Sequence, residues 1–180
     1  MKSACLVAIG IAGTLCQPSW AITPANEERS GSASLVEEVR RATRDFWDVN
    51  VAVAAGYEPF GGCVTGPERG AMGFHYANTA LVGDGLLDPQ KPDVLLYEWR
   101  NGRLRLLGVE FVVIAETWDA ANDGPPALMG QQFHYATSPN RYGLPPFYEL
   151  HVWAWRDNPF GAFVDWNPLV SCNNSGGHQH

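Results

Sequence analysis

The chain has 180 residues, of which 46% are hydrophobic and only 17% charged, a composition that argues against intrinsic disorder and against a coiled coil. Acidic residues outnumber basic ones by 19 to 12, and the resulting net charge of −7 disfavours nucleic acid and anionic membranes as partners. The length predicts one domain, and the 19 glycines and 13 prolines predict short elements joined by ordered loops rather than a bundle of long helices.

Residues 1–21 have the pattern of a cleaved secretory signal peptide. Lys2 supplies a positive charge, residues 6–15 form an apolar stretch, and residues 19–21 (Ser-Trp-Ala) fit a small-x-small cleavage site. The apolar stretch is too short to span a bilayer and Pro18 follows it, so a membrane anchor is the weaker interpretation. We therefore expect a secreted or periplasmic protein that has no membrane attachment after signal cleavage.

The next segment, residues 22–31, is small and polar, which predicts a flexible N-terminus. Ser32 or Ser34 is the expected N-cap of one long helix over residues 34–55, and Gly56 ends it. Apolar residues recur there at helical spacing and should pack as one stripe on a sheet. They are Leu35, Val36, Val39, Ala42, Phe46, Val49, Val53 and Ala54.

A Gly- and Pro-rich loop is expected over residues 59–73, followed by aromatic or β-branched runs that are typical of strands. Asn101-Gly102 between two of these runs indicates a hairpin whose loop length stays open. The expected fold is α+β, with one N-terminal helix packed on an antiparallel β-sheet or a small cupin-like barrel. This domain would span residues 32–172, with a disordered tail over 173–180. The strand runs cover residues 74–78, 94–99, 104–115, 133–137 and 147–155.

Signal cleavage would leave two cysteines, Cys63 and Cys172. Two cysteines in an oxidising compartment predict a disulfide, with the two Cα atoms within about 7 Å of each other. The bond would join the loop after the helix to the C-terminal segment. A metal site formed by the two thiols is the weaker interpretation.

Three of the five histidines lie in aromatic, strand-like runs, whereas His178 and His180 lie in the polar tail. His75 and His134 occupy the same position in a weak internal repeat, Phe-His-Tyr-Ala. Duplication, similar packing or coincidence would each explain this repeat. His151 follows Glu-Leu near the end of the last strand-like run. All three imidazoles are candidate metal ligands.

Alternate residues of a strand share a face, so the last run should present a set of polar and aromatic side chains on one side. If Leu150 and Val152 pack against the helix, the opposite side lines a second, more polar space. The side chains expected on the polar side of the last run are Glu149, His151, Trp153 and Trp155.

Glu110 lies in another, mainly apolar run, where a carboxylate without a partner is costly to bury.

Imidazoles together with a carboxylate suit a transition metal ion such as Cu, Fe or Zn. We predict a mononuclear site with His75, His134 and His151 as ligands, and with Glu149 or Glu110 as the fourth ligand or as a catalytic base. In the alternative interpretation, each histidine is a packed residue whose ring a carbonyl or a tyrosine satisfies.

The function expected from such a site is metal binding in an exported protein. If the chain is an enzyme, a metal-dependent oxidoreductase acting on a small organic molecule is the expected class, although a zinc hydrolase would use the same ligands. A non-catalytic carrier of a metal or an apolar ligand, and a structural module without metal, remain alternatives. The sequence leaves the metal, the substrate and the oligomeric state open.

Several segments together resemble a family of uncharacterised secreted bacterial proteins. The resemblance covers most of the chain after the signal peptide and implies a bacterial, exported setting, but no activity. The segments are Ala42-Thr43 through Asp48-Val49, Ala55-Gly56-Tyr57, Gly73-Phe74-His75-Tyr76, Leu87-Asp88-Pro89 through Leu95-Leu96-Tyr97-Glu98, and Glu149-Leu150-His151-Val152-Trp153.

Overall fold

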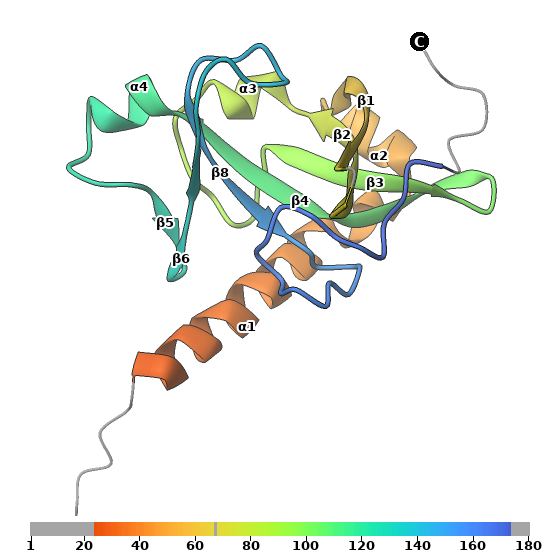
Figure 1. The fold of residues 1–180 in the computed structure, drawn as a ribbon, viewed down its shortest axis with the longest axis horizontal. Coiled ribbons are helices and arrows are strands. Elements are labelled where there is room, and N and C mark those ends of the chain that lie inside the picture. Colours follow the sequence, from red (N-terminus) through yellow and green to blue (C-terminus); the bar gives the residue numbers. More distant parts are fainter. Residues whose placement is uncertain (1–23, 67, 174–180) are drawn as a thin grey trace, which may run out of the picture.

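A computed structural model describes residues 24–66 and 68–173 of the chain. The expected signal peptide (1–21) and residues 174–180 of the expected tail lie outside the described residues. The fold is α+β, as the sequence predicts, with helix α1 on one face of a curled, six-stranded antiparallel sheet (Figure 1). Within the described part of the chain, no helix is long and apolar enough to cross a membrane.

The N-terminal helical region differs from the expected single helix over residues 34–55, because it consists of three pieces. They are α1 (Pro24–Thr43), a 3₁₀ turn η1 (Arg44–Trp47) and α2 (Val49–Ala54). The Asp48 side chain accepts a hydrogen bond from the backbone N–H of Asn50 and so acts as the N-cap of a new helix. The prediction of one helix was wrong because periodicity alone did not reveal this cap.

Helix α1 also begins earlier than expected, since residues 24–31 are helical where the sequence predicts a flexible segment. Pro24 suits the first turn of a helix, where a missing backbone N–H costs nothing. Figure 1 shows the N-terminal part of α1 running out beyond the sheet.

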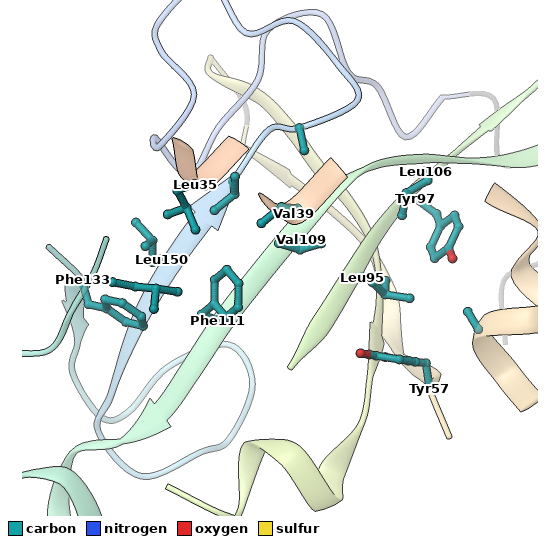
Figure 2. Close-up of a cluster of buried hydrophobic side chains, with 14 residues drawn as sticks. Leu35, Val39, Tyr57, Leu95, Tyr97, Leu106, Val109, Phe111, Phe133 and Leu150 are labelled. Carbon is teal, nitrogen blue, oxygen red and sulfur yellow. The ribbon is translucent and has the colours of Figure 1, made fainter. Parts of the chain in front are cut away.

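The C-terminal half of α1 packs on the sheet through the expected apolar stripe. Leu35 and Val39 are fully buried, and Figure 2 shows them beside Val109 and Leu150, above β4 (Arg103–Ile114) and β8 (Phe147–Val152). Phe46 is only partly buried against the same core. The helix therefore covers one face of the sheet at its centre.

The strand order of the sheet is β1-β2-β3-β4-β8-β7. The expected loop over residues 59–73 is wrong, because most of it forms β1 (Glu58–Gly66) and the start of β2 (Gly70–Ala77). Strand β1 is an edge strand with register shifts around Gly61 and Gly62. Its glycines and proline are residues that usually indicate a loop, so the sequence did not predict this strand. The remaining strands are β3 (Val94–Arg100) and the other edge, β7 (His134–Ala136).

The expected hairpin is present between β3 and β4. Arg100 pairs with Arg103, so the loop has two residues, Asn101 and Gly102, which both have positive φ as in a type I′ turn. The smaller elements lie in the connections between the main strands. They are α3 (Thr79–Val82), α4 (Ala115–Asp119) and the short hairpin of β5 (Ala127–Leu128) and β6 (Gln131–Gln132).

Side chains of the last strand alternate as expected up to Trp153. Leu150 and Val152 belong to the core under α1, whereas Trp153 belongs to a second core on the opposite face. Trp155 does not follow the expected alternation, because β8 ends at Val152 and the Trp155 indole N–H reaches back to Thr43 on α1.

The C-terminal segment after β8 folds back over the sheet. Ala71 on β2 and Asn167 exchange two backbone hydrogen bonds. The predicted disulfide between Cys63 and Cys172 is confirmed, with a Cα–Cα distance of 5.7 Å. It ties edge strand β1 to the C-terminal segment, and it fits a protein of an oxidising compartment.

Candidate metal centre

Three buried side chains gather on the sheet face that turns away from α1. Glu110 on β4 and His151 on β8 are direct cross-strand partners, so their side chains leave the sheet on the same side. His75 on β2 pairs with Leu96, whose side chain belongs to the core on this same face. The alternation of each strand thus directs all three side chains to one face.

Local backbone features bend the sheet beside this group. Strand β4 carries an extra residue, Leu107, opposite the Leu96–Tyr97 step of β3, and such a bulge increases the twist and bend of a strand. Gly73 has a φ of 96°, and a Cβ there would collide with the carbonyl oxygen of Tyr97. Glycine is therefore required two residues before His75 for β2 to follow β3 through the bend.

The potential ligand atoms are close to one another. His75 Nε2 lies 3.6 Å from Glu110 Oε2, and the ligand atoms of His75, Glu110 and His151 all lie within 4.8 Å of each other. Ligands that bind one zinc ion at about 2.0 to 2.2 Å are at most about 4.4 Å apart. Small side-chain rotations would therefore place the three groups around one ion.

All three side chains are almost completely removed from solvent, with exposed fractions of 3% for His75, 3% for Glu110 and 1% for His151. Among the described residues, neither ring nitrogen of His75 or of His151 has a hydrogen-bond partner. Buried polar atoms without partners are rare in folded proteins, and each one is costly. A cation between the rings would satisfy one nitrogen of each.

The electrostatic environment keeps both imidazoles neutral. Burial, reinforced by the positive charge that His151 would carry, lowers the pKa of His75 to about 3. Burial also lowers the pKa of His151. Neutral imidazole is the form that binds a metal ion, so neither ring must lose a proton first.

Glu110 is affected in the opposite direction. Burial, and after it the negative charge of neighbouring Glu149, raise the pKa of Glu110 well above its ordinary value. A proton that Glu110 retains can be shared with Glu149, which raises the pKa of Glu110 further. A divalent cation would replace that proton and remove the repulsion between the two carboxylates.

The structure separates the other two predicted ligands from this group. Glu149 is buried beside Glu110, and its Oε2 has no hydrogen-bond partner, but it lies outside the group of three. His134 is exposed on edge strand β7, where its Nδ1 lies 3.0 Å from Asp165 Oδ1. Of the predicted set, His75, His151 and Glu110 come together.

Asp165 is the residue that sequence reasoning missed. Its Oδ1 also lies 3.6 Å from Nδ1 of buried His151, so one carboxylate connects His151 to His134 at the surface. Metal-binding histidines usually direct their second nitrogen to a carboxylate or a carbonyl. Asp165 lies in the irregular C-terminal segment, where no periodic pattern signals its position.

A cavity of about 90 Å³ adjoins the group, and His75 and Glu110 form part of its wall. The rest of the lining is almost entirely apolar. This hollow leaves room for a small molecule beside an ion held by the three side chains. The other lining residues are Phe60, Ala77, Thr79, Val82, Val94, Val112, Tyr142, Leu144 and Phe147.

No protein-family model, no curated protein and no solved structure matches this chain. The fold and the site described above are therefore what bears on its function.

Proposed function

We propose that this chain is an exported protein that binds one transition metal ion through His75, Glu110 and His151. One observation carries the proposal: two fully buried imidazoles with unpartnered nitrogens lie against a buried carboxyl group. A packed structural role would leave four buried ring nitrogens unsatisfied, which is costly. One bound cation removes much of that cost.

The donor set favours iron or zinc. Two histidines and one carboxylate with open coordination positions are the ligands of non-haem Fe(II) oxygenases, and the same donors bind Zn in some hydrolases. Copper in electron-transfer sites requires a cysteine thiolate. Here both cysteines of the globular part are paired with each other.

The cavity beside the ligands supports action on a small organic molecule. Its lining is almost entirely apolar, and both His75 and Glu110 border it. As the first candidate activity we propose oxidation of a small substrate by dioxygen, which would accept the electrons of the substrate at an iron ion held by these residues. Glu149, whose charge acts on neighbouring Glu110, would orient that carboxylate or accept a proton near the ion.

Metal content tests the proposal directly. Protein secreted into a periplasm and purified without chelators should contain about one equivalent of metal by elemental analysis. His75→Gln, His151→Gln and Glu110→Gln should each lower the metal content sharply, whereas His134→Gln should retain it. Circular dichroism and thermal unfolding show whether each variant is folded.

A second measurement does not depend on variants of buried residues. Metal-free wild-type protein titrated with Co²⁺ should develop visible absorption bands of a nitrogen- and oxygen-bound ion. Reconstitution with Fe²⁺ under anaerobic conditions, followed by nitric oxide, should give the paramagnetic signal of an iron site with an open position. Absence of stoichiometric binding for Co²⁺, Fe²⁺ and Zn²⁺ would refute the proposal.

A further inference from the structure

A second hollow lies next to the cavity of the metal centre. It has a volume of about 340 Å³ and is lined by residues of β1 and of the loop before β8. Phe60 and Tyr142 line both spaces, and their ring centroids lie 6.3 Å apart. The two spaces therefore meet at these two rings. The remaining lining residues of the outer hollow are Gly61, Gly62, Val64 and Arg141.

Arg141 brings an uncompensated positive charge to the outer hollow. Its guanidinium carbon lies 5.1 Å from the ring centroid of Trp166, which gives the exposed side chain a stacking surface. Within residues 24–66 and 68–173, Arg141 makes neither a salt bridge nor a hydrogen bond. Its five N–H donors are therefore available to a ligand, in a chain where acidic residues predominate.

The two hollows together present three different surfaces to a ligand. The inner end holds the carboxyl group of Glu110, the middle is apolar, and the outer rim carries Arg141. A guanidinium binds carboxylates through parallel hydrogen bonds, whereas an apolar cavity disfavours an anion that has no partner there. An amphiphilic anion is therefore oriented with its charged end outward.

We propose that this site binds a short-chain organic carboxylate, with its carboxylate on Arg141 and its aliphatic chain in the cavity beside His75 and Glu110. The inference rests on the proposed function and deepens it by naming the substrate class. The cavity of about 90 Å³ is smaller than the roughly 150 Å³ engineered cavity that binds benzene, so a short aliphatic chain fits better than an aromatic ring.

Binding to metal-free protein tests the proposal separately from metal binding. In NMR titrations, acetate, butanoate and hexanoate should bind with affinities that rise by up to about fourfold per methylene until the cavity is full. Butanamide, which has the same chain without the charge, should bind at least tenfold more weakly than butanoate. No saturable binding of any acid would overturn the inference.

Two variants and one control locate the binding. Arg141→Gln should weaken butanoate binding at least tenfold, whereas Arg103→Gln, which removes an exposed arginine at the β3–β4 hairpin, should leave it unchanged. Val82→Phe should fill part of the cavity and weaken hexanoate more than acetate. Equal butanoate affinity in the wild type and Arg141→Gln would overturn the inference.

Repeating the titrations with Zn²⁺-loaded protein distinguishes the arginine from the ion as the anion site. If butanoate binding requires Zn²⁺ and is unchanged in Arg141→Gln, the carboxylate binds the metal ion and the proposal is refuted. Butanoate binding that depends on Arg141 in protein that takes up no metal supports the carboxylate site while refuting the metal centre.

Discussion

His75 and His151 lie on strands β2 and β8, which are separated by two other strands, yet their ring centroids are only 6.4 Å apart. Strands in a sheet are about 4.8 Å apart, so in a flat sheet the two backbones would be about 14 Å from each other. The curl of the sheet brings the rings together across its concave face. Glu110, on β4, one of the two strands between them, completes the group.

Asp165 should act as a positioning residue for His151. Asp165→Asn is expected to weaken metal binding about 10- to 100-fold, because it removes the negative charge that faces His151 Nδ1. Competition with a chelator of known affinity measures the loss. The Co²⁺ spectrum should shift as well, which a merely structural role would not cause.

His134→Gln is the matched control for Asp165, since His134 contacts the same carboxylate from the solvent side. We expect its metal affinity to stay within about threefold of wild type. A larger loss in His134→Gln than in Asp165→Asn would contradict the proposed role of Asp165.

Asp93 should make stability depend on pH. It is 2% exposed, and burial raises its pKa from 3.8 to about 7, against the opposing hydrogen bond from the Val112 N–H. Between these values the native carboxyl keeps a proton that the unfolded chain has lost, so its contribution to stability falls as pH rises from about 4 to 7. The full effect is on the order of 4 kcal/mol.

Asp93→Asn should remove this dependence, because an amide oxygen still accepts the Val112 N–H but carries no charge. Urea unfolding at pH 5 and pH 8 should show a smaller loss of stability in the variant than in wild type. Asp45→Asn, at an exposed position, is the control and should follow the wild-type curve. Parallel pH curves for Asp93→Asn and wild type would contradict the prediction.

The α1 stripe should contribute strongly to stability. Leu35→Ala is expected to cost about 2 to 5 kcal/mol, because its side chain is fully buried against the sheet. Phe46→Ala should cost less than the 3 to 5 kcal/mol of a fully buried ring, since Phe46 is only partly buried. Val53→Ala, at a 49% exposed position, should change stability by less than about 0.5 kcal/mol in urea unfolding.

The Cys63–Cys172 disulfide should stabilise the fold mainly by constraining the unfolded chain, since it joins residues 109 positions apart. Replacing both cysteines by serine is expected to cost about 2 to 5 kcal/mol. Reductant should bring wild-type protein to the stability of the double variant and leave that variant unchanged. Titration of two free thiols in unreduced protein would show that the bond is absent.

Local patterns in the sequence were sufficient for features that depend on neighbouring residues. Alternation along β8 correctly placed His151 opposite Leu150 and Val152, and two remaining cysteines predicted the disulfide. The same reasoning failed at Asp48, where a cap divides the helix, and at edge strand β1, whose glycines resemble a loop. At Asp48 a single capping residue ended a helix that the apolar periodicity predicted to continue. At β1 an irregular strand pairing formed where the composition predicted a loop.

Only the tertiary structure decided which residues form the candidate site. His75 and His134 stand in the same local motif, yet one is buried in the group and the other is exposed on an edge strand. The sequence predicted the strand face that His151 occupies, because side-chain alternation is a local property of a strand, but it assigned no face to His75 or His134. Strand order and curl depend on pairings between distant residues, and these alone bring His75, Glu110 and His151 together while leaving His134 outside.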